Sequence, residues 1–413
     1  MTMTVRGVAA AQAGLACPGP LSPHVDGFAA RLLRDGYALN TVREKCDLVA
    51  DLSRWLERRG LLLSALDDGQ LTQFLATRRR RNNTRRGDRA TGQQLLGHLR
   101  ELKEIAAAVH RVDRTPLACV TREFEEFLRA QRGLASSTVS DYSHTARNFL
   151  QNRFGCRALH LERLRPQDVH GFVLREVQRV SRSHGMGTVT ALRAFLRFLL
   201  QRGAIQTDLA RTLPGVACWR LSHLPKTLPR EQVEQLLACC DRSTPTGKRD
   251  YAILLLLARL GLRGGEVLAM TLEDLDWERG EIVVRGKGQR LERLPLPAEV
   301  GAALACYLCD VRPACASRHV FIRMKAPLHG FAGTSAIDCI VRRALRRAGL
   351  RSEFKGAHLL RHSLASELLR RGASLGEIGQ LLRHRQPTTT QIYAKVDIEA
   401  LRGIALPWPG GVQ

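Results

Sequence analysis

Residues 251–266 read YAILLLLARLGLRGGE, an apolar segment followed by a charged end. The segment from Tyr251 to Leu260 is almost entirely apolar, which predicts a helix buried on all sides in a folded core. Arg263 stands just beyond that helix, where a guanidinium is costly unless it has a function or an anionic partner. Glu266 is a candidate partner, so an ordinary ion pair remains one interpretation of Arg263.

The sequence on either side predicts a mixed α/β unit over residues 226–406. Residues 231–240 predict a second helix, and residues 281–285 and 290–296 predict two strands. Between the strands, Lys287 stands between two glycines, a composition typical of a short hairpin turn.

Two blocks of short amphipathic helices precede this unit, at residues 23–112 and 118–215. The segment from Thr41 to Arg58, for instance, carries its apolar residues at the spacing of one helix face. Residues 1–22 lack the long apolar core of a secretory signal, so we expect them to form a disordered tail. Neither helical block shows the spacing of a catalytic site.

The two helical blocks resemble copies of one unit displaced by 97 residues. Identical residues cluster at two equivalent helix starts. The matched pairs are Gly36 and Gly133, Ala38 and Ala135, Thr41 and Thr138, Val42 and Val139, Gln70 and Gln167, Thr91 and Thr188, Leu95 and Leu192, Leu99 and Leu196, and Leu102 and Leu199. Because amphipathic helices resemble one another, coincidence remains an alternative to duplication.

The chain is strongly basic. Lys and Arg total 64 against 39 acidic residues, which gives a net charge of +25, and only eight of the 64 are Lys. Such an excess favours a polyanionic partner, and the planar guanidinium suits bidentate contacts with phosphate. An acidic protein or a membrane surface remains an alternative, although no stretch has the ~18 apolar residues of a spanning helix. Arg richness can also reflect genome composition.

A dense run of arginines lies in the first helical block. Seven Arg fall between Arg78 and Arg89. A charge run is usually a solvated loop, but in so basic a chain these donors can reach a DNA backbone. The candidate DNA-binding residues are Arg78, Arg79, Arg80, Arg81, Arg85 and Arg86.

The eleven cysteines are odd in number and scattered, which favours reduced thiols in a cytoplasm over a disulfide framework. Metal-like spacing occurs once, in the set Cys306, Cys309, Cys315 and His319. The first two cysteines lie in an apolar, helix-like segment, so we expect core packing there rather than zinc.

Cutting a phosphodiester without a metal requires a nucleophile, donors for the non-bridging oxygens and a proton source for the leaving group. His358 and Arg361 lie three residues apart in a helical stretch, so they share one face. Lys287 carries an ammonium that can give up a proton, whereas a guanidinium effectively cannot. His384 precedes Tyr393, a candidate nucleophile. Each residue alone has a non-catalytic interpretation. The spacing of His358 and Arg361 can arise by chance, Lys287 fits a solvated turn, and Tyr393 fits core packing.

Taken together, these residues resemble the catalytic motifs of the tyrosine recombinase family, the phage integrases. The motifs are Gly261-Leu262-Arg263 with Glu266, Gly286-Lys287-Gly288, the string HLLRHSLAS from His358, and His384 followed nine residues later by Tyr393. Their order and spacing match the family over residues 228–396. Arg383 and Lys395 depart from the pattern, because members often carry Gly before this histidine and His two residues after the tyrosine.

The resemblance implies a role for each matched position. It implies that Arg263 and Arg361 bind the scissile phosphate and that Lys287 is the general acid for the leaving 5′ oxygen. His358 would assist the transfer of the phenol proton, and His384 would support the phosphate. Tyr393 would form the 3′-phosphotyrosyl link. Because the bond energy is kept in that link, the family needs no metal or nucleotide cofactor.

The resemblance also implies the fold class and the partners. The fold would be mainly α, with a small antiparallel sheet in the C-terminal α/β catalytic domain and helical DNA-binding domains before it. The chain would act as a homotetramer on double-stranded DNA with inverted half-sites, in a bacterial cytoplasm at the nucleoid, to integrate, excise or transpose a mobile element. A type IB topoisomerase, which shares the constellation, and a non-catalytic DNA-binding regulator remain alternatives.

Overall fold

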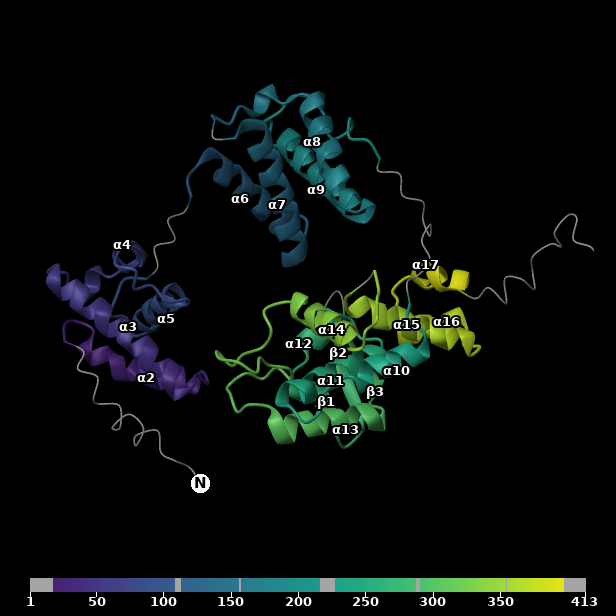
Figure 1. Ribbon diagram of the computed structural model, residues 1–413. Helices are drawn as coiled ribbons and strands as arrows, with labels where there is room; N and C mark the ends of the chain where they lie inside the picture. The colour runs from purple at the N-terminus through teal and green to yellow at the C-terminus, as the bar shows by residue number, and fades with distance from the viewer. Residues whose placement is uncertain are drawn as a thin grey trace, which may run out of the picture. The chain divides into compact units, whose positions relative to one another are not determined.

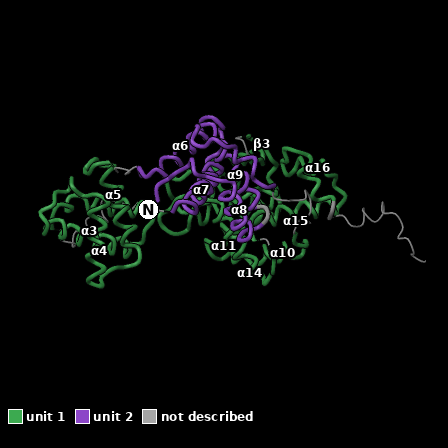
Figure 2. The backbone as a smooth tube through the Cα atoms, turned by 90° about the horizontal axis from the view of Figure 1, so that it is seen from above, with its two compact units in different colours: residues 1–108, 223–413 green, residues 109–222 purple. Residues whose placement is uncertain are grey.

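In the computed structural model, the chain is described over residues 18–107, 113–155, 157–215, 227–286, 290–353 and 355–396. It divides into two compact units, one of residues 109–222 and the other of residues 1–108 together with 223–413 (Figure 2). Figure 1 labels their helices and strands. None of the helices in the described ranges is long and apolar enough to cross a bilayer.

The N-terminal helical group packs around a single apolar core. Its elements are η1 Ser22–His24, α2 Val25–Arg34, α3 Leu39–Arg58, η2 Leu63–Ala65, α4 Asp68–Arg80 and α5 Asp88–Glu101. Phe28, Leu56 and Leu95 are fully buried where the inward faces of α2, α3 and α5 meet. The Asp67 carboxylate caps α4 by accepting a 2.8 Å hydrogen bond from the backbone N–H of Gln70.

The expectation of a disordered tail over residues 1–22 is wrong for its last residues, because the ordered structure begins before residue 22. Leu21 is fully buried, and its backbone N–H donates to Ser53 Oγ at 3.1 Å. The Ser53 hydroxyl in turn donates to the Pro18 carbonyl at 2.8 Å. Residues 18–22 are therefore packed on α3, and the rest of the expected tail lies outside the described residues.

The second unit is a helical group with an aromatic core. It contains α6 Pro116–Ala130, α7 Ser136–Phe154, η3 Leu161–Arg163, α8 Pro166–Arg179 and α9 Arg182–Gln201. Phe124 of α6 meets Phe195 of α9 edge-on at 5.0 Å between ring centroids, and Phe149 meets Phe172 in the same way at 5.3 Å. Such pairs add stabilisation beyond the burial of their area.

The two helical groups share their order of elements. In each, two helices are followed by a 3₁₀ turn and two further helices, and α3 and α7 begin 97 residues apart, at Leu39 and Ser136. Several matched positions are also equivalent in burial: Val42 and Val139, Leu95 and Leu192, and Leu99 and Leu196 are all fully buried. The match fails at the last pair, because Leu102 is 49% exposed whereas Leu199 is buried.

The C-terminal part of the chain combines eight helices with a small sheet in its described residues. The helices are α10 Arg230–Ala238, α11 Pro245–Arg259, α12 Gly264–Ala269, α13 Ala298–Cys306, α14 Ser335–Arg347, α15 Ala357–Arg370, α16 Leu375–Leu381 and α17 Pro387–Thr390, with helical turns η4 Leu272–Asp274, η5 Tyr307–Val311 and η6 Gln391–Val396. The fold is thus mainly α with a small antiparallel sheet, as predicted.

The sheet has three antiparallel strands in the order β1 Leu275–Asp276, β2 Glu281–Arg285 and β3 Leu291–Pro295. β2 and β3 confirm the predicted hairpin, with Val283 opposite Arg293 and Arg285 opposite Leu291. Ile282, Val284 and Leu294 turn inward, which agrees with the two-residue period of a half-buried sheet.

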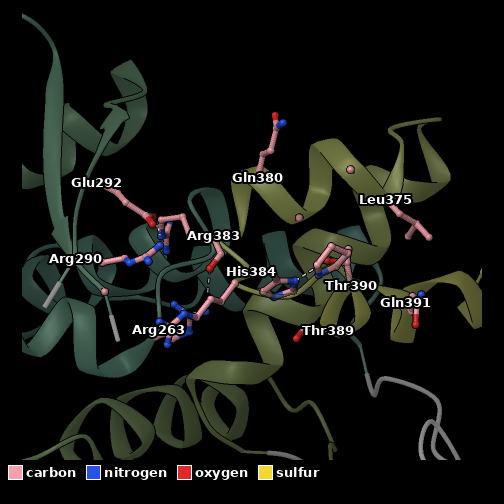
Figure 3. Close-up of a pocket in the computed structure, with 15 residues that line it drawn as sticks. Arg263, Arg290, Glu292, Leu375, Gln380, Arg383, His384, Thr389, Thr390 and Gln391 are labelled. Carbon is pink, nitrogen blue, oxygen red and sulfur yellow. Dashed lines mark hydrogen bonds and ion pairs between the residues drawn. The ribbon is translucent and has the colours of Figure 1, made fainter. Parts of the chain in front are cut away.

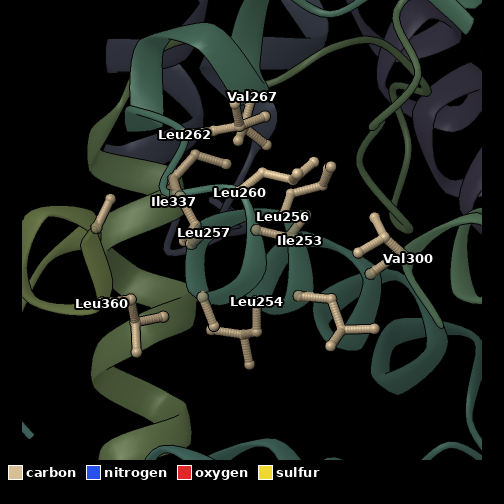
Figure 4. Packing of buried hydrophobic residues seen from close by; sticks show 14 of the residues in the cluster. Ile253, Leu254, Leu256, Leu257, Leu260, Leu262, Val267, Val300, Ile337 and Leu360 are labelled. Carbon is tan, nitrogen blue, oxygen red and sulfur yellow. The ribbon is translucent and has the colours of Figure 1, made fainter. Parts of the chain in front are cut away.

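Helix α11 lies at the centre of this part and confirms the predicted buried helix. Every residue from Ile253 to Leu257 is fully buried, and Figure 4 shows several of them packed among side chains of α14 and α15. Beyond the helix, Gly261 adopts a φ of +57°, a conformation that glycine tolerates best. This turn delivers Arg263 to the start of α12, next to the helix that carries Arg361.

Candidate active site

Four segments bring the predicted catalytic residues together. Arg263 comes from the start of α12, His358 and Arg361 from α15, His384 from the loop after α16, and Tyr393 from η6. Arg263 and His384 line a cavity of about 780 Å³, shared with Arg383 and Thr390 (Figure 3).

Lys287 lies outside the described residues, because the structure describes β2 only as far as Gly286 and β3 only from Arg290. Gly286 and Arg290, which flank the Lys287 turn, both line the same cavity as Arg263.

Arg263 is held by Glu266, and it also faces the cavity. One guanidinium nitrogen lies 2.6 Å from Glu266 Oε1, and the Arg263 backbone N–H donates to Glu266 Oε2 at 2.8 Å. The side chain keeps 31% of its surface exposed. The ordinary ion pair considered from the sequence is therefore real, and it fixes the cation without removing it from the cavity.

Arg361 is buried, at 3% exposure, and joins two backbone segments. Its guanidinium donates to the carbonyls of Gly261, in the turn after α11, and of Leu382, at the end of α16. Burial lowers the pKa of Arg361 to about 10, and the nearby charges of Arg263 and Arg383 act in the same direction. The side chain stays cationic at neutral pH, so a second positive charge is fixed beside the first.

Tyr393 is almost completely buried, at 1% exposure. Its hydroxyl lies 2.8 Å from Nδ1 of His362. Burial raises the pKa of Tyr393 to about 12, although the positive charges of Arg361 and Arg263 oppose that rise. The phenol is therefore protonated at neutral pH, and it requires a proton acceptor and nearby cations before its oxygen can attack a phosphate.

His362 is a residue of the site that the sequence reasoning missed. The motif string HLLRHSLAS contains two histidines, and the resemblance gave a role only to the first. His358 and His362 are one helical turn apart on α15, with ring centroids 6.2 Å apart, and it is His362 that reaches the phenol. The spacing of four residues was the available signal, because it places both rings on one face of the helix.

His384 is positioned by a local hydrogen bond and by stacking. Its Nδ1 lies 2.8 Å from Thr390 Oγ1, and its ring is nearly parallel to that of Tyr393, with centroids 6.3 Å apart. Burial lowers the pKa of His384 to about 4, with added repulsion from Arg361 and Arg263. A neutral imidazole is therefore held beside the Tyr393 ring at physiological pH.

Arg383, the departure from the family pattern, occupies a position that suits glycine. Its φ is +56°, the left-handed conformation that a residue with a Cβ adopts at some cost. A buried ion pair offsets that cost, because its guanidinium lies 2.7 Å from Glu266 Oε2. Burial opposes ionisation of Glu266, but the Arg263 backbone N–H and the charge of Arg383 outweigh it, so the pKa of Glu266 is lowered.

The predicted DNA-binding arginines divide into two kinds. Arg78 is buried, pairs with Asp51 and Asp88, and donates to the Asn83 carbonyl at 2.8 Å, so its guanidinium serves the packing of α4. The other five are exposed: Arg79, Arg80, Arg81, Arg85 and Arg86.

The cysteine cluster does not behave as expected from the sequence. Cys309 is exposed and Cys306 is only half-buried, with its thiol 3.3 Å from Asp310 Oδ2, so the expectation of core packing is wrong for these two. No three metal-binding side chains come together within the part of the chain that the structure describes.

Comparison with known proteins identifies the two recognisable domains. Residues 226–399 match the model of the phage integrase family, and residues 121–203 match the phage integrase N-terminal SAM-like domain. Both matches fall within the domain limits that were predicted from the sequence, 226–406 and 118–215.

One relative extends the match over nearly the whole chain, and others cover about two thirds of it. The Sinorhizobium fredii protein named integrase/recombinase y4rA is 46% identical over 397 residues, covering 96% of each chain. The tyrosine recombinase XerC of Thermodesulfovibrio yellowstonii is 31% identical over 67% of this chain and 92% of its own. A crystal structure of the XerH site-specific recombinase bound to a palindromic difH substrate shares the fold, with a TM-score of 0.55 and 21% identity over 68% of this chain and 83% of its own.

The phage integrase model spans the part of the chain that carries Arg263, Arg361 and Tyr393. The chain belongs to the phage integrase family, the tyrosine-type site-specific recombinases.

Proposed function

We propose that this chain cuts and rejoins duplex DNA at a specific site through a 3′-phosphotyrosyl intermediate on Tyr393. The observation that carries the proposal is that four separate segments bring together a buried phenol, two guanidinium groups and neutral imidazoles, and that Arg263 and His384 of this set line a cavity. This set supplies a nucleophile, fixed positive charge for a phosphorane and groups that can exchange protons.

The proposed reaction balances without a cofactor. The Tyr393 oxygen attacks the scissile phosphorus while Arg263 and Arg361 stabilise the charge that develops on the non-bridging oxygens. The bond from phosphorus to the 5′ oxygen breaks, and Lys287 protonates that oxygen. His384 supports the phosphate, and His358, which lines a second cavity with Arg263, assists the movement of the phenol proton. Rejoining reverses these steps with the 5′ hydroxyl of another strand.

We further propose that the chain acts as a homotetramer on inverted half-sites, to integrate, excise or transpose a mobile element. Two solved structures of similar fold support this proposal: the XerH recombinase is bound to a palindromic substrate, and the integrase of the Tn1549 transposon is in complex with circular intermediate DNA. A type IB topoisomerase would relax supercoils and exchange no strands. The decisive assay therefore mixes two differently sized duplexes that carry the site and looks for recombinant products.

Independence from metal ions is the first prediction. We expect cleavage of a half-site substrate to be unchanged in excess EDTA, because every charge that the proposed mechanism requires comes from a side chain. The comparison is the same protein sample with and without EDTA, followed by added Mg²⁺. A loss of cleavage on chelation that Mg²⁺ restores would indicate a nuclease-like mechanism.

The second prediction concerns the N-terminal group, which we propose is a second copy of the helical DNA-binding unit. Its exposed arginines at positions 79, 80, 81, 85 and 86 should bind DNA outside the segment held by the rest of the chain. Changing all five to Gln in the full chain should shorten the footprint. The slope of log affinity against log salt should become shallower by about 0.9 for each phosphate that the variant no longer neutralises.

Arg43→Gln is the control for this variant, because Arg43 is exposed on α3 of the same group but lies outside the arginine run. It should change neither the footprint nor the slope by a comparable amount. An unchanged footprint and slope in the five-residue variant, combined with failure of tetramer assembly, would make the group an oligomerisation element instead.

A further inference from the structure

We infer that His362 accepts the phenol proton of Tyr393 during DNA cleavage and returns it during rejoining, an inference that rests on the proposed function. His362 Nδ1 and the Tyr393 hydroxyl are 2.8 Å apart, and the two rings lie 5.6 Å apart between centroids. A neutral imidazole with its proton on Nε2 accepts the phenol O–H through Nδ1. The reacting oxygen and the proton acceptor are therefore already in contact.

Neither of the other two histidines of the site is placed to take the phenol proton directly. His384 stacks on the face of the tyrosine ring, and its Nδ1 is bonded to Thr390, so neither feature directs it at the phenol oxygen. His358 faces the cavity that it shares with Arg263, one helical turn before His362. Of the three, only His362 has a hydrogen bond to the hydroxyl of Tyr393 among the described residues.

The surroundings keep His362 in the form that can accept a proton. Its charged and titratable neighbours are His358 and Arg361 on α15, His384 from the loop and Tyr393 on η6. Burial lowers the pKa of His362 to about 4, and the first two neighbours act in the same direction. The imidazole is neutral at physiological pH, and the imidazolium formed during attack is unstable beside Arg361, which favours return of the proton in rejoining.

The step conserves atoms and charge. The Tyr393 O–H bond breaks and its proton moves to His362 Nδ1. The phenolate oxygen then bonds to phosphorus, the bond to the 5′ oxygen breaks, and that oxygen takes a proton from the acid of the proposed function. In rejoining, the 5′ hydroxyl returns its proton to that acid as its oxygen attacks the phosphorus, the bond from phosphorus to the Tyr393 oxygen breaks, and the departing phenolate recovers its proton from His362.

Two substitutions in the full chain test this role. His362→Asn keeps a hydrogen-bond acceptor near the position of Nδ1 but cannot carry a proton, and His362→Phe keeps the ring volume without either nitrogen. We expect both to slow single-turnover cleavage of a nicked half-site substrate by about 10²- to 10⁴-fold, with half-site binding preserved. His160→Asn, an exposed histidine in the other unit, is the matched control and should cleave at the wild-type rate.

The pH profile separates a proton acceptor from a packing residue. The wild-type rate should be nearly flat between about pH 6 and 8, whereas the variants should gain about tenfold per pH unit, because their phenol must lose its proton to solvent. The deficit should therefore narrow as the pH rises. A substrate with a 5′ sulfur leaving group should not rescue the variants, because the missing function lies at the nucleophile.

Three results would overturn the inference: cleavage by His362→Asn within about threefold of wild type, a slower rate with an unchanged pH profile, or rescue by the sulfur substrate. Failure of the proposed function is a separate outcome, since the wild-type protein would then form no adduct at all.

Discussion

We expect the Tyr393→Phe protein to form no covalent adduct with a nicked half-site substrate while binding that half-site as the wild type does. The substitution removes one oxygen and keeps the ring, which is packed among Ala365, Ile378 and Leu382. The loss of the hydrogen bond to His362 should cost only about 1 kcal/mol of stability. Gel mobility measures the binding, and denaturing electrophoresis measures the adduct.

Tyr307→Phe is the matched control for this experiment. Tyr307 is also a fully buried tyrosine of the C-terminal part, and its hydroxyl accepts a hydrogen bond from the Ile322 backbone N–H. Its variant should form the adduct at a rate close to that of wild type. Adduct formation by the Tyr393→Phe protein would show that another residue is the nucleophile.

Removing the guanidinium of Arg263 or of Arg361 should have the next largest effect on cleavage. Arg263→Ala and Arg361→Ala should each slow single-turnover cleavage by about 10²-fold or more, because each removes a charge that stabilises the phosphorane. Their effects on folding should differ. Arg361→Ala leaves the buried carbonyls of Gly261 and Leu382 without their donor, at about 1–3 kcal/mol each, whereas Arg263 is partly exposed.

Thermal unfolding of the same samples distinguishes the two effects. Arg263→Ala should melt close to wild type, because Glu266 keeps its ion pair with Arg383, and Arg361→Ala should melt clearly lower. Arg361→Lys keeps a positive charge but lacks the guanidinium that donates to both carbonyls. It therefore separates the loss of charge from the loss of these two hydrogen bonds. Wild-type cleavage by Arg263→Ala would mean that Arg263 serves only its ion pair with Glu266.

The sequence predicted the site residues where composition and local pattern contrast with their surroundings. Arg263 follows an almost entirely apolar helix, and Tyr393 follows His384 at the nine-residue spacing of the family motif. Both residues therefore stand out in the sequence. The hairpin was predictable because two short strand-like runs lie on either side of the Gly-rich segment from Gly286 to Gly288. β1 was not, since its two residues are too short to show a period.

The contact between His362 and Tyr393 could not be predicted from local pattern. It joins residues 31 apart and depends on how η6 packs against α15, which is a matter of tertiary structure. Arg383 is similar, because its ion pair with Glu266 joins residues 117 apart in the chain and depends on where α12 lies.

The burial of Arg78, by contrast, had a signal in the sequence. Leu71, Phe74 and Arg78 are spaced by three and four residues, which places all three on the inward face of α4. The charge of the arginine run concealed that periodicity, so the residue was grouped with its exposed neighbours.

The chemical identity of the protein–DNA link tests the central claim most directly. The wild-type protein would be incubated with a suicide substrate nicked near the cleavage site, digested, and analysed by mass spectrometry for peptides that carry a nucleotide. The proposed mechanism predicts one modified residue, Tyr393, joined to the 3′ phosphate of the cleaved strand. An adduct on another residue, a 5′-phosphate linkage, or cleavage without any adduct would contradict it.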